Sequence, residues 1–409
     1  LLAHSATLHV SPEGSGTDGL SWETAYPTIT EAVIASTTGD SIWVKAGVYE
    51  EAVEVTKEIS LYGGFAGTES LLEFSLRNIL ENLVEIDARS LEKSAISIRN
   101  VTGAVIDGLT LKGLEGEGGG ISVIDASPYI TSCIIRDSYS FAGGGGINFR
   151  RSSGVVENCV ITENFSDDVG GGIASFEGSE PTLRNCIIAS NDAPFAGGVC
   201  VALNERGIHL VNCLVRDNHG NSVVGGICAS IGFVNVVNSI IRGNLPSNLF
   251  AENDGGEILV TYSNIQGGWP GEGNIDADPL FMDSENGDFR LQENSPCIDT
   301  ASTEGPLTDI DGNPRPIDLP GVGRDGTGDE FDMGPYERVP SGSPIPTSTF
   351  TSTVTPTPTF TLTPTVTPTP TLTLTPSPTY PTDINQDGVV NAEDLVILLE
   401  DWGRVSGAR

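Results

Sequence analysis

Short apolar runs rich in isoleucine and valine recur along the middle of the chain, separated by glycine, asparagine and aspartate. One motif returns at a fixed interval: asparagine or serine, then usually cysteine, then two apolar residues. Its second position falls at Cys133, Cys159, Cys186, Cys213 and Ser239. Neighbouring copies are 26 or 27 residues apart, so this region is an internal repeat.

Two further columns keep the same register. A Gly-Gly pair precedes an apolar residue at Ile121, Ile147, Ile173, Val199 and Ile227, and an asparagine stands at Asn164, Asn191, Asn218 and Asn244. A period of about 26 residues is too short for a helix pair or a propeller blade. Each repeat instead holds short β-branched runs with tight bends, so we predict an all-β, single-stranded parallel β-helix with one repeat per coil.

The columns fall where such a coil has to bend. Neighbouring coils lie about 4.8 Å apart, so each residue stacks on its counterpart in the next coil. Asparagine tolerates the left-handed backbone of a bend, and its amide can hydrogen-bond along the stack. Cysteine is small and apolar enough for an interior corner, which predicts an inward stack of Cys133, Cys159, Cys186 and Cys213. Cys200 and Cys228 also match in the repeat, and a disulfide between them stays open.

A solenoid needs covers for its two ends, and the flanking segments fit that role. Residues 27–36 predict a short amphipathic helix, and residues 41–49 predict a strand and turn. We therefore expect an N-terminal cap with the first coils over residues 1–90, β-helix repeats over 91–275 and a C-terminal cap over 276–338.

The same flanking segments resemble a known group of proteins. Residues 8–14, 42–49 and 61–69 are similar to the start of bacterial right-handed parallel β-helix proteins of the pectate-lyase-like superfamily. Residues 278–281, 287–291, 295–299, 311–316 and 332–337 resemble the region called a choice-of-anchor Q domain. The resemblance implies a secreted or cell-surface protein, and the family is of mixed function. We expect a polysaccharide or cell-surface glycan as the partner.

Composition changes abruptly after the C-terminal cap. The segment 339–382 consists almost entirely of threonine, proline and serine with scattered apolar residues, and none of residues 340–382 is charged. Such a sequence cannot bury a core and favours extended polyproline II, which predicts a semi-rigid spacer. Threonine- and proline-rich stalks of this kind are typical of extracellular multi-module proteins.

A calcium loop is predicted directly after the spacer. Oxygen ligands recur at positions 1, 3, 5, 7, 9 and 12 of the segment, with Gly388 at position 6, which is the spacing that Ca²⁺ loops use. The ligands would be the side chains of Asp383, Asn385 and Asp387, the carbonyl of Val389, Asn391 through water, and Asp394.

The region 383–409 resembles one repeat of a dockerin module. Aspartate at position 12 and the missing entering helix are features of that family, and residues 392–402 predict the following helix. The resemblance implies a cohesin-like scaffold protein as a partner. Ala392 and Glu393 stand where the family's recognition pair would fall, which departs from its pattern.

The strongly acidic composition of the chain argues against some classes of partner. The chain carries 55 acidic and 20 basic side chains, a formal net charge of −35. Nucleic-acid phosphates attract lysine and arginine, so we expect no nucleic-acid partner. No stretch approaches the roughly 20 consecutive apolar residues of a membrane span.

Candidate catalytic groups form one column in the repeat. Asp137, Glu163 and Asp217 align, with arginines beside them at Arg136, Arg216 and Arg242. Polysaccharide lyases and glycosidases need such carboxylates, and in glycosidases the pair lies about 5–9.5 Å apart. The same column also fits outward charge that keeps a solenoid soluble. The aspartates of residues 309–313 likewise fit either a calcium site or a structural turn.

Three functions stay open from the sequence. The first is a surface module that binds carbohydrate or mediates adhesion, the second a polysaccharide lyase or glycoside hydrolase, and the third a structural spacer. A cleft that gathers the carboxylates with an arginine would favour the enzyme, and an aromatic platform would favour carbohydrate binding.

The calcium loop gives a direct prediction. Adding Ca²⁺ to the full chain is expected to raise hydrogen-exchange protection over residues 383–403, because ligation orders the loop and the helix after it. Asp387→Ala should abolish the response by removing a ligand. A segment whose protection ignores Ca²⁺ in the unsubstituted chain would show that the loop assignment is wrong.

Overall fold

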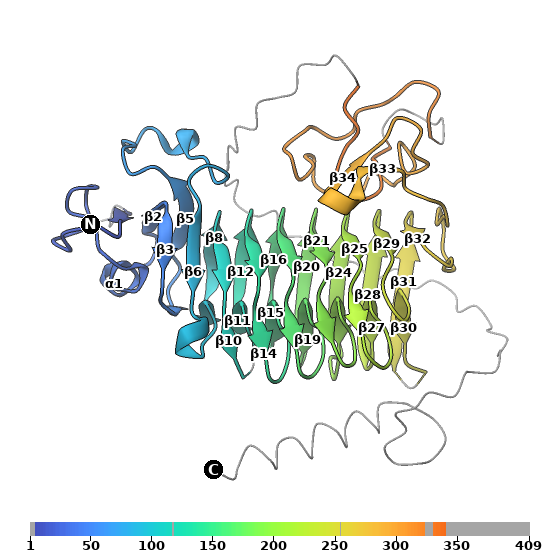
Figure 1. Cartoon of the computed structure of the whole chain (residues 1–409), viewed down its shortest axis with the longest axis horizontal. Helices are drawn as coiled ribbons and strands as arrows, with labels where there is room; N and C mark the ends of the chain where they lie inside the picture. The colour runs from blue at the N-terminus through green and yellow to red at the C-terminus, as the bar shows by residue number, and fades with distance from the viewer. Residues whose placement is uncertain (1–4, 117, 254, 324–329, 341–409) are drawn as a thin grey trace, which may run out of the picture.

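The chain winds through the same succession of short strands coil after coil, as the repeat predicts (Figure 1). The computed structural model describes residues 5–116, 118–253, 255–323 and 330–340. The predicted spacer from residue 341 onward and the predicted calcium loop lie outside these residues. Within them, each full coil contributes a strand to sheets that we name A, B and C, and five coils add a short strand to sheet D.

Sheets A and B form two sides of the solenoid. Sheet A contains β1 (Thr7–Val10), β2 (Ser41–Lys45), β5 (Ser60–Phe65), β8 (Thr102–Asp107), β12 (Ser127–Thr131), β16 (Ser153–Glu157), β20 (Glu180–Arg184), β24 (Gly207–Val211), β28 (Gly232–Val237) and β31 (Gly256–Thr261). Sheet B contains β3 (Gly47–Tyr49), β6 (Val84–Asp87), β9 (Thr110–Lys112), β13 (Ile134–Arg136), β17 (Val160–Thr162), β21 (Ile187–Ala189), β25 (Leu214–Arg216), β29 (Ile240–Arg242) and β32 (Asn264–Ile265).

Sheet C is the third side of the solenoid, and sheet D adds a short strand to five of the coils. Sheet C contains β4 (Val53–Val55), β7 (Ile96–Arg99), β11 (Ile121–Ile124), β15 (Ile147–Arg150), β19 (Ile173–Phe176), β23 (Val199–Val201), β27 (Ile227–Ala229) and β30 (Leu249–Ala251). Sheet D contains β10 (Leu114–Glu115), β14 (Tyr139–Ser140), β18 (Phe165–Ser166), β22 (Asp192–Ala193) and β26 (His219–Gly220).

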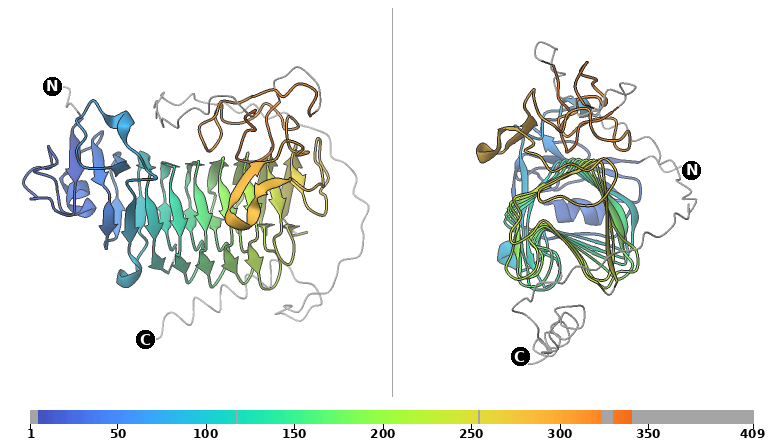
Figure 2. Two further views of the ribbon diagram at one scale, coloured as in Figure 1. Left: turned by 45° about the horizontal axis from the view of Figure 1, so that its top comes forward. Right: turned by 90° about the vertical axis from the view of Figure 1, so that its right-hand side faces the viewer.

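Alternation along each strand fixes which side chains point inward. In sheet B, Ile135 pairs in register with Leu111 and Ile161, and all three are completely buried in the main core. The residues on either side of them, such as Ile134 and Arg136, point outward because side chains alternate across a strand. The interior is therefore a set of apolar stacks, and the outer face is a set of aligned columns. Figure 2 shows how the successive coils superimpose when the solenoid is viewed along its axis.

The N-terminal segment covers the first end of the solenoid as predicted, whereas residues 276–340 lie against one side of the coils rather than over the second end. The predicted helix is confirmed as α1 (Ile29–Ala35), which buries Ile29, Ala32 and Val33 against the first strands. Glu51 accepts hydrogen bonds from the first two helical N–H groups at 2.8 Å, where a carboxylate complements the helix dipole. None of the helices in the described parts of the chain is long and apolar enough to cross a membrane.

The C-terminal cap, residues 276–340, packs on the outside of sheet B (Figure 1). It contains the hairpin β33 (Phe281–Asp283) and β34 (Asp288–Leu291) around a short 3-10 helix (Ser284–Asn286). Its apolar residues cover the outward column Ile187, Leu214 and Ile240. Two other 3-10 helices, Phe74–Leu76 and Arg89–Leu91, flank β6.

The asparagine column forms a buried ladder, as predicted. The side-chain N–H of Asn191 donates to the side-chain oxygen of Asn218 at 2.9 Å, and Asn164 donates to Asn191 in the same way at 3.0 Å. Each oxygen also accepts from the backbone N–H of the preceding asparagine. The ladder therefore satisfies the polar groups of each bend by contact with the next coil.

The cysteines pack as small buried side chains. Cys133, Cys159, Cys186 and Cys213 lie in the main core, which confirms the predicted stack. Cys200 and Cys228 pair in register, but both are free thiols in a second, smaller core. The open possibility of a disulfide between them is therefore not realised.

The ladder predicts a large cost for removing one rung. Asn191→Ala should lower the free energy of unfolding by about 3 kcal/mol or more, because several buried polar groups lose a partner at about 1–3 kcal/mol each. Thr182→Ala, an outward position on β20, should change it by less than about 0.5 kcal/mol. Denaturant unfolding of both variants tests this. Equal stabilities would contradict the account of the ladder.

Candidate functional site

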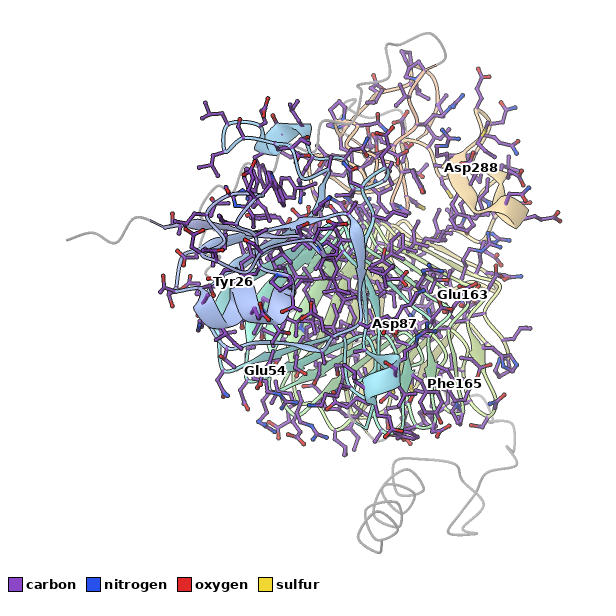
Figure 3. The ribbon with its side chains drawn as sticks, turned by 60° about the vertical axis from the view of Figure 1, so that its left-hand side comes forward. Tyr26, Glu54, Asp87, Glu163, Phe165 and Asp288 are labelled. Carbon is purple, nitrogen blue, oxygen red and sulfur yellow. The ribbon has the colours of Figure 1, made fainter. Side chains whose placement is uncertain are left out.

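The predicted column of Asp137, Glu163 and Asp217 lies at the bend between sheets B and D. All three have left-handed backbones, with φ of 51°, 55° and 51°. Each is followed directly by a buried polar residue of the bend, such as Asn164. Glu163 lies on this edge of the coils near Phe165 (Figure 3). The turn geometry therefore explains why short polar residues recur here, and their catalytic role stays a prediction.

The structure does not bring the three carboxylates together with the predicted arginines in one cleft. Asp217 accepts from the Nε of its neighbour Arg216 at 2.6 Å, and that guanidinium lies over the rings of Phe281 and Phe289 in the cap. Arg242 donates to a cap carbonyl, Ala277 O, at 2.7 Å. The cap therefore contacts the column near Asp217 and Arg242. Asp137 lies several coils closer to the N-terminus, next to β13, where the cap makes no such contact.

Asp137 belongs to a cluster of four charged groups on β6, β9 and β13. The ammonium of Lys112 lies 3.1 Å from Glu85 and 3.7 Å from Asp137. The guanidinium of Arg136 joins the same two carboxylates at 3.6 and 3.3 Å. Glu85 and Lys112 were missed by the sequence analysis, because the regular repeat begins only after them. The strand pairing of β6 with β9 puts them in place.

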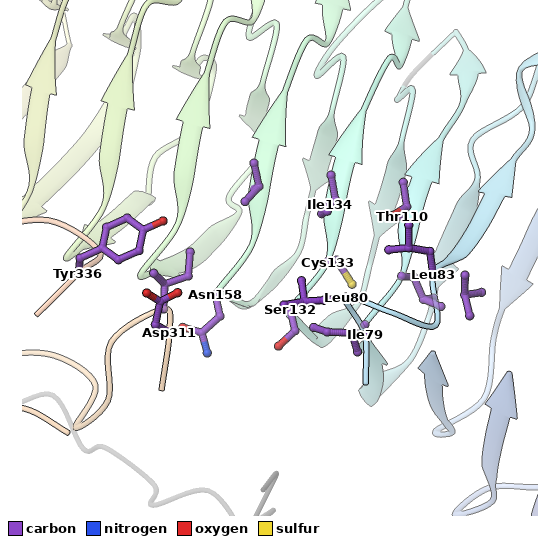
Figure 4. A pocket seen from close by; sticks show the side chains of 15 residues that line it. Ile79, Leu80, Leu83, Thr110, Ser132, Cys133, Ile134, Asn158, Asp311 and Tyr336 are labelled. Atoms are coloured by element: carbon purple, nitrogen blue, oxygen red, sulfur yellow. The ribbon is translucent and has the colours of Figure 1, made fainter. Parts of the chain in front are cut away.

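A cleft of about 220 Å³ is lined by other residues of these strands, and none of the four charged groups lines it (Figure 4). Its floor includes the outward column Thr110, Ile134 and Val160, which continues the column that the cap covers further along. Ser132 and Asn158 lie at the bend between sheets A and B and add polar groups to one edge. We call the outward surface of β6, β9, β13 and β17 the open face.

One wall of the cleft comes from the loop between β5 and β6, which we call the N-wall loop (residues 66–83). It contributes Ile79, Leu80 and Leu83, and Leu80 is 72% exposed. A buried ion pair holds this loop on sheet A: Arg77 donates to Asp107 at 2.6 Å, and both side chains are 1% exposed. Removing either partner of such a buried pair would leave an uncompensated charge and destabilise the attachment of the loop.

The opposite wall comes from the C-terminal cap, through Ile310, Asp311 and Tyr336. The carboxylate of Asp309 accepts from the backbone N–H groups of Asp311 and Asn313 at 2.9 and 2.7 Å. Residues 309–313 therefore form a structural turn. No group of three or more metal-ligating side chains occurs in the described ranges.

The cap wall is electrically negative around Asp311. Removal of water by the surrounding protein raises the pKa of Asp311, with Asp309 and Asp288 adding to the effect and Arg290 opposing it. Arg290 itself is held by Asp288 through two bonds of 2.8 and 2.5 Å. Little positive charge is therefore left over on this wall.

Sheet D carries a small group of aromatic side chains, none of which lines the cleft. Tyr139 and Phe165 occupy paired positions, and their rings stack at 5.3 Å between centroids and 13° between planes. Phe141 meets Tyr139 edge-on at 5.0 Å. The rings of Tyr139 and Phe165 face each other along the solenoid. The aromatic pair therefore stabilises neighbouring coils and does not offer a flat platform for a sugar.

Comparison with known proteins supports the handedness of the coils. A family model described as a right handed beta helix region matches residues 78–239. The chain is thus a right-handed parallel β-helix with a cleft on one outer face. The matched range contains neither the predicted choice-of-anchor Q region nor the dockerin-like repeat, so both stay predictions. No curated protein matches the sequence.

Several solved structures are similar in fold. One is pectate lyase Pel9A, with a TM-score of 0.47 and 11% identity over 82% of this chain and 97% of that chain. Another is a pectin methylesterase from Aspergillus niger, with a TM-score of 0.42 and 17% identity over 67% and 86% of the two chains. A rhamnogalacturonan lyase has a TM-score of 0.37 and 15% identity over 63% and 74%. Likenesses this low carry no information about activity.

The cap that forms one wall has a charged interior. The side chains of Arg315 and Glu337 are fully buried and lie 3.3 Å apart, and Glu337 also accepts from Ile317 N at 2.8 Å. Burial raises the pKa of Glu337 to about 7, against the lowering effect of Arg315. Burial likewise raises the pKa of Asp332 well above its ordinary value.

This interior predicts a pH dependence. The folded cap keeps the Glu337 proton at pH values where the unfolded chain releases it, so this contribution to stability is complete below about pH 4.5 and is lost as pH rises through about 7. From pH 5 to pH 8, Glu337→Gln should therefore lose less free energy of unfolding than the unsubstituted chain, by about 1–3 kcal/mol. Glu293→Gln, an exposed cap position, should follow the unsubstituted chain. Parallel pH curves for all three proteins would contradict the assignment.

Proposed function

We propose that this chain binds a polysaccharide in the cleft on the open face of sheet B. The observation that carries the proposal is the composition of the cleft: an apolar strip along its floor with polar groups at its edges. Ligand sites are typically apolar concavities with a few placed polar groups. The floor of the cleft spans three neighbouring coils, whose outward residues Thr110, Ile134 and Val160 stack in register.

The chemistry of a sugar ring fits this arrangement. A pyranose has C–H groups on its faces and hydroxyl groups around its edge. The side chains of Ile134 and Val160 offer apolar contact to the C–H groups. Ser132, Asn158 and Tyr336 line the same cleft and offer donors and acceptors for the hydroxyls.

Binding without cleavage fits the charged cluster beside the cleft. A glycosidase needs one carboxylic acid as proton donor and a second carboxylate as base or nucleophile. Glu85 and Asp137 each form ion pairs with both Lys112 and Arg136, and neither carboxylate lines the cleft. The four charged groups therefore pair with one another, and no pair of carboxyl groups is placed in the cleft to act as acid and base.

The proposal includes an extracellular or cell-surface location. A Thr/Pro spacer would hold the β-helix away from its attachment point, and the calcium loop at residues 383–394 would attach it to a cohesin-like scaffold protein. The support for this part is the sequence pattern alone. In this arrangement the β-helix contacts the glycan and the C-terminal region supplies the tether.

The test is binding of the full chain to xylan, β-glucan, mannan, pectin and alginate oligosaccharides by calorimetry. Ile134→Gln should weaken binding about tenfold through lost apolar contact, and Tyr336→Phe about three- to tenfold through a lost hydrogen bond. Matched controls are Leu259→Gln, on the exposed face of sheet A, and Tyr26→Phe, in the N-terminal cap; both should bind as the unsubstituted chain does.

Two outcomes would contradict the proposal. One is a folded chain that binds none of these glycans. The other is equal binding by the cleft variants and their controls. The same samples should be followed for unsaturated-uronate absorbance and for new reducing ends, because turnover would show an enzyme rather than a binding module.

A further inference from the structure

The charges around the cleft carry information about the glycan. Among the residues that line the cleft in the described part of the chain, Asp311 alone has a formally charged side chain. Asp288 and Asp309 act on Asp311 from the same wall, and Arg290 is bound to Asp288. A ligand in the cleft therefore meets net negative charge on the cap side.

The cations of the open face are already engaged by carboxylates. Lys112 and Arg136 each contact both Glu85 and Asp137. Arg89, on the turn that follows β6, binds Asp87 through bonds of 3.0 and 2.7 Å. A uronate carboxylate could pair with one of these cations only by displacing a carboxylate that the fold already supplies.

We propose that the cleft selects uncharged glycans and rejects uronate-rich ones, with Asp311 as the residue that sets this preference. The inference rests on the proposed function and narrows it to a class of ligand. Repulsion between the Asp311 carboxylate and a uronate carboxylate at contact distance weakens binding by about fivefold in a water-like environment. The loss is larger when water is partly excluded. The chain's net charge of −35 adds long-range repulsion of a polyanion.

The experiment compares neutral hexasaccharides of xylan and β-glucan with a galacturonate hexasaccharide, on the full chain at 20 and 200 mM NaCl. We expect the uronate to bind at least about fivefold more weakly than the better neutral ligand at low salt. Added salt should raise the uronate affinity, because it screens repulsion, and leave the neutral affinity unchanged.

Charge variants locate the effect. Asp311→Lys should close most of the gap between uronate and neutral ligand, and Asp311→Asn should close part of it. Glu205→Lys makes the same change of charge at an exposed turn between sheets C and A, away from the cleft, and should leave most of the gap in place. A gap that responds equally to Asp311→Lys and Glu205→Lys would overturn the role of Asp311.

The possible failures are distinguishable. Uronate binding as tight as neutral binding, or tighter, overturns this inference and leaves the proposed function standing. A folded chain that binds neither class overturns the proposed function and this inference with it. A neutral glycan bound in the cleft with a repelled uronate supports both.

Discussion

The structure depends on one constraint, the fixed register from each coil to the next at its bends. A left-handed residue turns the chain between sheets B and D, and the asparagine that follows it in most coils bonds to the next asparagine along the stack. A slip by one residue would turn inward side chains outward and leave buried amides unpaired. In the coils that it joins, from Asn164 to Asn244, the ladder therefore fixes which residues reach the surface.

The outward column of sheet B has two roles along its length. At Ile187, Leu214 and Ile240 it is buried beneath the C-terminal cap. At Ile134 and Val160 it continues past the edge of the cap and becomes the floor of the cleft. The cap and the N-wall loop are thus what turn a uniform solenoid surface into a site, because they close the cleft at two ends and leave a few coils accessible.

Much of the fold was predictable because its main determinant is periodic. The repeat gave the coils, the asparagine ladder and the cysteine stack, and the amphipathic pattern gave α1. The cleft could not be predicted in this way, because a repeat pattern reports only on the residues that repeat. The walls come from non-repeating segments, and Leu83 and Asp311 are far apart in sequence with no shared pattern. Asp137 was found through the repeat, but its partners Glu85 and Lys112 precede the regular copies. Glu163 and Asp217 share its column because the bend requires polar residues there.

The central claim is that the open face of sheet B is the surface that binds glycan. Hydrogen exchange on the full chain, with and without a saturating neutral oligosaccharide, tests it most directly. The account predicts added protection in the N-wall loop at residues 79–84, in residues 108–112, 132–136 and 158–162, and in the cap around residues 310–311 and 336. Protection confined to sheet A, or to the aromatic pair of sheet D, would contradict the account.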